Sequence, residues 1–386
     1  NPAGLARIER STVDVNGQAF VLRVGLAPGL LRAASGTTAD GGYVEITSIP
    51  SALTLVRNLG SGVIGGFHLF VPRLGDHTDR VTLDEPLADG VTRWQLLESQ
   101  KSSEYRAGLT FGFRVLDNLR VGVGFSILYD QFYTNFGFFG GRYAIDGRVI
   151  DAAGLSGAGS VQSLGGLISA GVQWAPIPEL HIGLSVISPA LSFGYNYSGS
   201  LAAVAATEGG PIDFEASDFG GLEPQVELVL PMRVRLGVAY VWDGGWVSID
   251  GDLQHPIDRP EAGIVRELVF GVRLGTRIRV DDKVALGFGL FTDRSPNRAP
   301  QQYGESRIDF YGGTFGVDIR SPHRLGEGES ASEIVFATHV SLRYALGVGT
   351  MAGLLFDTNA PDPAQPYLLE TIVNEIGLQL GSALYF

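Results

Sequence analysis

The sequence contains no cysteine among its 386 residues, which excludes disulfides, thiolate metal sites and cysteine nucleophiles. It also lacks a continuous apolar run of the kind that forms a transmembrane helix. Its two long stretches without charge, residues 152–178 and 180–206, are interrupted by glycine, serine and proline. Basic residues are in deficit, and the net charge of −13 argues against non-specific nucleic-acid binding.

The end of the chain shows strict alternation instead. Every second residue from Ile376 to Phe386 is apolar except Ser382, and the residues between them are mostly polar or small. Such alternation predicts a β-strand with one apolar face. A terminal aromatic on that face is typical of the closing strand of an outer-membrane barrel.

The same pattern recurs along the chain, and 54 glycines suit tight turns and a crowded inner face. We therefore expect an all-β, antiparallel transmembrane β-barrel of about 14 strands, formed by residues 13–386 and preceded by a short N-terminal plug remnant in residues 1–12. The expected strands are 13–27, 43–58, 62–75, 104–116, 119–133, 161–175, 180–197, 226–242, 245–255, 265–280, 283–292, 307–320, 332–350 and 370–386.

Short and long connections alternate between these strands. Tight turns are expected at residues 117–118, 243–245 and 281–282, and long connections at 73–103, 131–160, 198–224 and 293–306. Barrels of the bacterial outer membrane have short periplasmic turns and long outer loops. The alternation therefore predicts that the barrel lies in the bacterial outer membrane, with its tight turns in the periplasm and its long connections outside.

The expected third strand departs from the pattern, because residues 62–72 are apolar on both faces. Gly65 and Gly66 weaken a strand ladder, Phe67 follows them, and Pro72 cannot donate a ladder hydrogen bond. One interpretation is a lateral gate in the barrel wall. The other is a regular strand packed inwardly on a plug.

With these residues described, the chain resembles the FadL/TodX family of hydrophobic-compound transporters. Asn1-Pro2-Ala3 is similar to the motif at the end of that family's plug, so the chain is expected to be a mature or truncated form. One departure is residues 286–289, Leu-Gly-Phe-Gly, where the family usually has Arg-x-Gly-Tyr. The other segments that carry the resemblance are residues 49–72, 230–231, 236–240, 246–250, 274–275, 281–282 and 286–296.

The resemblance implies an outer-membrane channel for passive uptake of hydrophobic molecules, either long-chain fatty acids or aromatic hydrocarbons. Such solutes would be captured by outer loops and would leave sideways through the wall into the bilayer. The alternative is a FadL-like barrel that acts as a docking subunit of a secretion or surface-assembly complex, with a partner protein at the outer loops. Outer-membrane lipid and lipopolysaccharide are the expected surroundings.

Two groups of residues are candidate binding sites. Aromatic side chains gather in the expected connection after the fifth strand, where they form either a capture groove or a self-packed loop. Arginines on predicted inward faces could hold a carboxylate, although ion pairs with Glu227, Asp250, Asp252, Glu267, Glu333 or Glu375 are favoured. The candidates are Phe132, Phe136, Phe138 and Phe139 with Phe193 and Tyr195 as a facing wall, and Arg114, Arg233, Arg273 and Arg277 in the lumen.

The sequence does not predict an enzyme. Its six histidines are scattered, and neither a Gly-x-Ser-x-Gly motif nor metal-ligand spacing accompanies them. His339 and Ser341 share an expected inward face and are the nearest approach to a catalytic pair. We interpret them as lumen-lining residues and expect no cofactor and no metal.

Overall fold

The computed structural model describes residues 1–208, 210–223, 230–259, 264–325, 332–357 and 364–386. In these ranges a short 3-10 helix, η1 (Pro2–Arg7), precedes eighteen strands. No helix in these ranges has the length and apolar character needed to cross a membrane. The strands are β1 (Thr12–Ala33), β2 (Thr38–Gly60), β3 (Val63–Leu87), β4 (Gly90–Leu116), β5 (Leu119–Ala144), β6 (Val149–Ile177), β7 (Leu180–Ile187), β8 (Leu191–Thr207), β9 (Ile212–Glu223), β10 (Arg233–Trp242), β11 (Gly245–Gln254), β12 (Ile257–Arg259), β13 (Ile264–Arg266), β14 (Val269–Arg279), β15 (Val284–Asp293), β16 (Ser306–Leu325), β17 (Ser332–Phe356) and β18 (Ala364–Tyr385).

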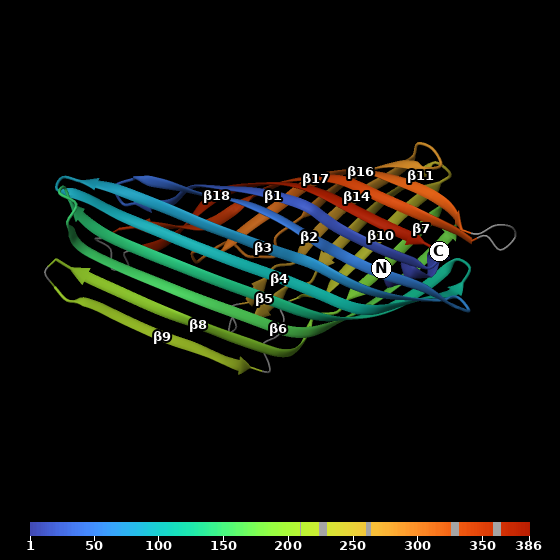
Figure 1. Cartoon of the computed structure of the whole chain (residues 1–386), viewed down its shortest axis with the longest axis horizontal. Helices are drawn as coiled ribbons and strands as arrows, with labels where there is room; N and C mark the ends of the chain where they lie inside the picture. Colours follow the sequence, from blue (N-terminus) through green and yellow to red (C-terminus); the bar gives the residue numbers. More distant parts are fainter. Residues whose placement is uncertain (209, 224–229, 260–263, 326–331, 358–363) are drawn as a thin grey trace.

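The main sheet closes on itself. β1 pairs with β18 at one junction and β5 with β6 at another, and antiparallel neighbours complete a ring. Fourteen strands form this ring: β1–β7, β10, β11 and β14–β18. The prediction of an antiparallel barrel of about 14 strands is confirmed. β8 and β9 form a hairpin outside the ring, called the flap below, which continues from β6 (Figure 1).

Several expected long connections are in fact strand. β5 and β6 are joined by residues 145–148, so the prediction of a connection over residues 131–160 is wrong. Likewise, β3 and β4 extend the sheet through most of residues 73–103. β5 has 26 residues, whereas about 9–11 suffice to cross a bilayer. Beyond the bilayer both faces of a strand tolerate polar residues, so the alternation that reveals a strand is lost there.

The barrel has two unlike ends. Short turns at residues 61–62, 117–118, 178–179 and 243–244 lie at the end that also holds both chain termini (Figure 1). The tall hairpins of β3–β4, β5–β6 and the flap lie at the opposite end. We call these the periplasmic end and the outer end, following the turn lengths of outer-membrane barrels.

A broad apolar band covers the outside of the ring. Leu109 on β4, Phe125 on β5, Leu236 on β10 and Phe270 on β14 are all exposed, as a lipid-facing surface requires. Trp174 and Trp242 lie next to periplasmic turns, where interfacial aromatics belong. The chain is therefore a transmembrane barrel of the outer-membrane type.

A dry core closes part of the outer end. The ring of Trp94 on β4 stacks on Phe356 of β17 with centroids 4.5 Å apart, and Phe138 of β5 stacks on Phe356 at 5.3 Å. Leu30 and Leu83 are fully buried in the same cluster. Strands from opposite walls thus meet in what we call the aromatic cap: Trp94, Phe138, Phe356, Leu30 and Leu83.

Candidate functional site

The Asn-Pro-Ala segment is seated inside the barrel on a row of glycines. Gly112, Gly122 and Gly171 lie side by side on β4, β5 and β6, and a side chain on any of them would collide with residues of η1 or with Asn1. The amide nitrogen of Asn1 donates to the backbone carbonyls of Val172 at 3.0 Å and Leu184 at 3.2 Å. The expected plug motif is therefore held by the inner wall.

The side-chain oxygen of Asn1 caps its own segment by accepting a hydrogen bond from the Ala3 amide at 3.0 Å. Pro2 occupies the first helical turn, where its missing N–H costs nothing. Ala3 and Ala6 are fully buried against the wall. Sequence, local capping and burial together fix η1 as a plug-like element.

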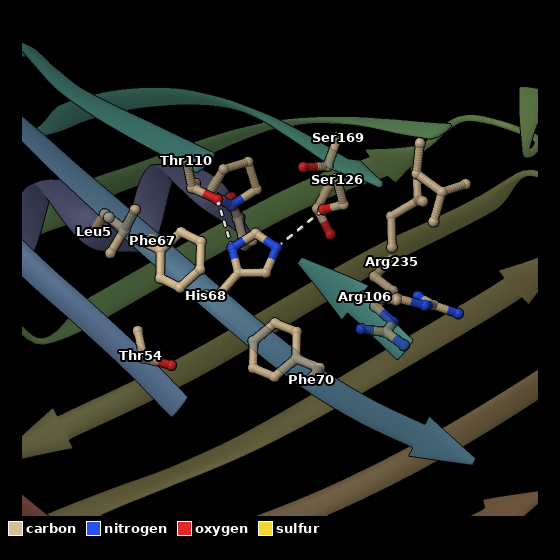
Figure 2. A pocket seen from close by; sticks show the side chains of 16 residues that line it. Leu5, Thr54, Phe67, His68, Phe70, Arg106, Thr110, Ser126, Ser169 and Arg235 are labelled. Atoms are coloured by element: carbon tan, nitrogen blue, oxygen red, sulfur yellow. Dashed lines mark hydrogen bonds between the residues drawn. The ribbon is translucent and has the colours of Figure 1, made fainter. Parts of the chain in front are cut away.

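A cavity of about 280 Å³ lies beside η1 (Figure 2). Its lining combines an apolar part with hydroxyl groups, one histidine and two arginines. The apolar residues are Leu5, Phe67, Phe70, Leu167 and Ile187, and the polar ones include Thr54, His68, Arg106, Thr110, Ser126, Ser169 and Arg235.

His68 is fixed in the centre of this cavity (Figure 2). Its Nε2 is 2.9 Å from the hydroxyl of Ser126, and its Nδ1 is 3.3 Å from the hydroxyl of Thr110. The ring also stacks on Phe70 with centroids 4.8 Å apart. Sequence reasoning missed His68, although it is the only strongly polar side chain in the apolar stretch of residues 62–72.

The wall at β3 is interrupted, but not where the glycines predicted it. Gly65 and Gly66 pair regularly with Arg57 and Val56 on β2 and with residues of β4 on the other side. A side chain on Gly66 would contact Leu5, so this glycine makes room for η1. The expectation of a weakened ladder at the glycine pair is therefore wrong.

The irregularity lies at Pro72. Pairing between β2 and β3 extends only to Ala52 opposite Phe70, and the β3–β4 register shifts between Phe70 and Arg73. Above this point β2 continues along β1, while β3 continues along β4. The backbone pairing of β2 with β3 therefore ends directly beside the cavity, since Phe70 also lines it. Above this point side chains join the two strands, and Glu45 of β2 accepts a hydrogen bond from the backbone N–H of Asp76 at 2.9 Å.

The candidate capture aromatics lie on both faces of β5. Phe136 faces the lumen, where it covers Gly157, and Phe138 belongs to the aromatic cap. Phe139 points outward over Gly154 and is 43% exposed. The prediction of one aromatic loop is wrong because residues 132–139 form a strand, in which successive side chains point to opposite faces.

Two of the remaining aromatics do share a surface. The register places Phe132 beside Val161 of β6, and Val161 beside Tyr197 of the flap. Tyr195 lies opposite Ser163 on the same inner face, and its ring is 5.7 Å from that of Tyr197. Phe193 instead covers Gly166 on the outer face, together with Phe125.

Three candidate lumen arginines form ion pairs. Arg233 approaches Asp252 at 2.7 Å, and Arg273 lies 4.0 Å from the same carboxylate. Arg277 pairs with Asp318 at 2.7 Å. Asp252 is almost fully buried, so truncating it would leave adjacent guanidinium groups without compensation.

Arg114 differs from the other candidates. It lies opposite Arg120 in the β4–β5 register near the periplasmic end and is exposed, without an ion pair in the described ranges. Three of the expected carboxylate partners pair with arginines other than the four candidates. Glu375 pairs with Arg23 and Arg343, Glu267 with Arg307, and Glu333 with Arg10. Glu227 lies outside the described residues.

The His339–Ser341 pair is not arranged for nucleophilic catalysis. His339 Nδ1 lies 2.6 Å from Asp318, which also accepts from Arg277. The hydroxyl of Ser341 donates to Gln379 at 3.2 Å rather than to the histidine. Within the described part of the chain, no group of three or more metal-binding side chains converges.

No protein-family model and no curated protein sequence matches the chain. Solved structures match its fold. A FadL homologue of Pseudomonas aeruginosa superposes with a TM-score of 0.57 at 13% identity, over 100% of this chain and 92% of that one. The toluene transporter TodX of P. putida gives 0.55 at 13%, and the toluene transporter TbuX of Ralstonia pickettii 0.51 at 14%, each over 100% of this chain and 92% of the other. At these identities the likeness establishes the architecture: the chain folds as a FadL/TodX-type barrel.

Proposed function

We propose that this barrel is a bacterial outer-membrane channel for passive uptake of hydrophobic molecules. The observation that carries the proposal is the cavity beside η1, because its apolar wall ends where β2 and β3 separate. The likeness to TodX and TbuX, both described as toluene transporters, supports it. The barrel works without a catalytic step and without a cofactor.

The solute leaves sideways, between β2 and β3, into the bilayer. Phe70 lines the cavity at the last paired position, and Pro72 follows where the pairing is lost. Phe67, which lines the cavity, is also 38% exposed. A lateral route carries an apolar solute directly into lipid. This route is favourable because the solute's apolar surface is not exposed to periplasmic water.

The cavity also bears on the class of solute. Its apolar lining includes the rings of Phe67 and Phe70 as well as Leu5, Leu167 and Ile187, and aromatic rings pack favourably on an aromatic solute. Aromatic hydrocarbons are therefore the favoured solutes, with fatty acids as the alternative.

The test is uptake into proteoliposomes of a labelled aromatic hydrocarbon. Ala52 and Phe70 lie opposite each other at the last paired position, so Ala52→Cys with Phe70→Cys would lock the strands there. The native chain has no cysteine, so this disulfide is the only one that can form. We expect uptake by the reduced pair and little by the oxidised pair. Equal uptake in both states would remove the β2–β3 exit.

One observation favours a docking role at the outer end. Phe139, Gly154, Val204 and Phe214 form one row across β5, β6 and the flap, which presents an apolar outer surface. Phe214 is 68% exposed there. If a partner protein docks here, Phe214→Asp should abolish complex formation and leave uptake unchanged. If the channel works alone, no complex forms with the native protein either. Lipid surrounds the apolar band in either case, and lipopolysaccharide lies against the outer end.

A further inference from the structure

The polar side of the cavity beside η1 is built across neighbouring strands. Four residues lie opposite one another in register: Thr54 of β2, His68 of β3, Gly108 of β4 and Ser126 of β5. His68 reaches the hydroxyl of Ser126 across Gly108, and a methyl group on this glycine would lie 2.8 Å from Nε2 of His68. Gly108 therefore makes room for a hydrogen bond that links β3 to β5.

The next row of the wall, towards the periplasm, adds further hydroxyl groups. Thr110 of β4, Gly124 of β5 and Ser169 of β6 lie opposite one another there. A methyl group on Gly124 would lie 2.6 Å from Oγ of Ser169 and 3.1 Å from Oγ1 of Thr110, so this glycine leaves the space between them open. The cavity-lining residues that we call the His68 network are His68, Thr54, Thr110, Ser126 and Ser169 (Figure 2).

The His68 network retains hydrogen-bonding capacity for a solute. A neutral imidazole donates from one ring nitrogen and accepts at the other, so one of Ser126 and Thr110 accepts from His68 and the other donates to it. In either tautomer the accepting hydroxyl keeps its own proton, and both hydroxyls keep lone pairs. Among the described residues, none is hydrogen-bonded to the hydroxyls of Thr54 and Ser169.

A plain hydrocarbon in this cavity would take these groups out of water without offering them a hydrogen bond. Polar groups that are buried without partners cost free energy. A site built to hydrogen-bond a solute hydroxyl therefore discriminates strongly against the analogue that lacks it. The His68 network thus favours a solute that carries a hydroxyl group.

The apolar side of the cavity suits an aromatic ring. Phe70 stacks on His68 with centroids 4.8 Å apart, and Leu5 and Leu167 line the cavity with them (Figure 2). Small-molecule pockets commonly combine an apolar lining with a few polar groups that fix the orientation of the ligand. A solute ring can pack on Phe70 while its hydroxyl is directed to the His68 network.

The two arginines of the cavity do not favour an acid. Arg106 is paired with Glu104, and Arg235 with Asp252 at 3.0 Å. Asp130 lies opposite Glu104 and adds a further negative charge at this level of the wall. An anionic solute would compete with these carboxylates, and its charge would be costly to move into the bilayer. The cavity therefore favours a neutral hydroxyl over a carboxylate.

We propose that the solute of this barrel is an aromatic molecule with a hydroxyl group, of the phenol class, and that the His68 network recognises this hydroxyl. The inference rests on the proposed uptake function and narrows the class of aromatic solute. A phenol is uncharged at neutral pH, because the pKa of a phenolic hydroxyl is about 10. It can therefore leave through the wall into lipid as a neutral molecule.

The first experiment compares three solutes that share one methyl-substituted ring: toluene, p-cresol and 4-methylbenzoate. Equilibrium dialysis of each labelled solute against the detergent-solubilised barrel, with empty micelles as the blank, gives the dissociation constants. We expect p-cresol to bind about tenfold more tightly than toluene, as one or two added hydrogen bonds would provide. We expect 4-methylbenzoate to bind no more tightly than toluene. Equal binding of p-cresol and toluene, or tightest binding of 4-methylbenzoate, would overturn the inference.

The outcomes separate this inference from the proposed function. If the native barrel takes up neither toluene nor p-cresol into proteoliposomes, the uptake function itself fails. If it takes up both and also binds them equally, only the recognition of the hydroxyl fails.

The second experiment removes the centre of the network. His68→Phe keeps a ring beside Phe70 but deletes both ring nitrogens, so p-cresol should bind about tenfold more weakly and toluene should be affected less than about twofold. His77→Phe is the matched control, since His77 lies on the same strand and does not line the cavity. A parallel loss of both solutes in His68→Phe, or an equal effect of His77→Phe, would contradict the proposal.

A milder variant keeps the test decisive if His68→Phe does not fold. Ser169→Ala deletes a hydroxyl that has no partner in the described part of the protein, so the variant should assemble normally. We expect about threefold weaker binding of p-cresol and unchanged binding of toluene. Ser248→Ala, which changes a lumen serine of β11 outside this cavity, is the control. Unchanged p-cresol binding by Ser169→Ala would exclude this hydroxyl from the site and overturn the network as the recognition element.

Discussion

Gly122 of β5 lies against Pro2 of η1 so closely that a methyl group on Gly122 would overlap the Pro2 backbone. Neither partner can move easily, because Asn1 anchors η1 to the carbonyl groups of Val172 and Leu184. The plug segment and the inner wall are therefore fitted to each other at a backbone contact, which a side chain cannot relieve by changing rotamer.

The first prediction follows from this contact. Gly122→Ala should dislodge η1 or strain the wall, at a cost of about 1–3 kcal/mol in the free energy of unfolding. Gly194 on β8 is the control, since nothing lies within 4 Å of its added methyl group. Urea unfolding of the barrel in lipid vesicles measures both variants. Equal stabilities would show that η1 is not held by the glycine row.

The second prediction concerns the inside and outside of the wall. Leu236 is 55% exposed on the apolar band, while Gly237 faces the carboxylate of Asp250. Leu236→Arg should cost about 2–4 kcal/mol near the bilayer midplane. Gly237→Arg should cost less, because the guanidinium enters a wet lumen beside an acid. If folding measurements rank the two substitutions the other way, the facing of β10 is reversed.

The membrane-crossing parts of the strands could be predicted from sequence, and the rest could not. Residues 104–116 and 119–133 alternate because lipid lies on one side of them and the lumen on the other. The same strands continue past the bilayer, where residues such as Lys101 and Asn135 are exposed to water and the alternation disappears. The expected loops over residues 73–103 and 131–160 are therefore the upper halves of strands, whereas the expected connection over residues 293–306 is confirmed.

The site could not be predicted because it depends on the register between neighbouring strands, which a single sequence does not reveal. Gly112, Gly122 and Gly171 are far apart in the chain and form a seat only because their strands are aligned at those positions. The break between β7 and β8 is similar, since Pro189 signals it but does not show that β8 leaves the ring with β9. The expected weakening of the ladder at Gly65 and Gly66 is wrong because glycine signals either a kink or a close neighbour, and the close neighbour of Gly66 is Leu5.

The third prediction compares Phe138 of the aromatic cap with its outward-facing neighbour Phe139. Phe138→Ala removes a ring stacked on Phe356 and packed near Trp94, and should cost about 3 kcal/mol or more. Phe139→Ala changes the next residue, which points outward, and should be close to neutral. Thermal unfolding of the two variants provides the comparison. A larger loss for Phe139→Ala would mean that the faces of β5 are assigned wrongly.

The fourth prediction concerns capture of the solute on the flap side. Phe132 and Phe136 lie on the inner face of β5, outside the aromatic cap. Replacing both with serine should slow uptake severalfold at low solute concentration, because less apolar surface is offered to the solute. Assembly should be normal, as measured by the heat-dependent mobility shift. Uptake at the wild-type rate would leave these rings a packing role only.

The last prediction is a pH dependence at the periplasmic turn between β14 and β15. Oδ1 of Asp281 accepts hydrogen bonds from the amides of Lys283 and Val284, each at 2.7 Å. These bonds favour the ionised carboxylate and hold the pKa of Asp281 below its ordinary value. The resulting stabilisation is complete above the ordinary value of about 3.9 and is lost as the pH falls through the lower folded value. Asp281→Ala should therefore lower the unfolding midpoint at neutral pH and make less difference in strong acid. Asp282→Ala, which removes the neighbouring carboxylate, is the control. A midpoint difference for Asp281→Ala that stays constant between these conditions would exclude the ionised carboxylate as the source of the turn's stability.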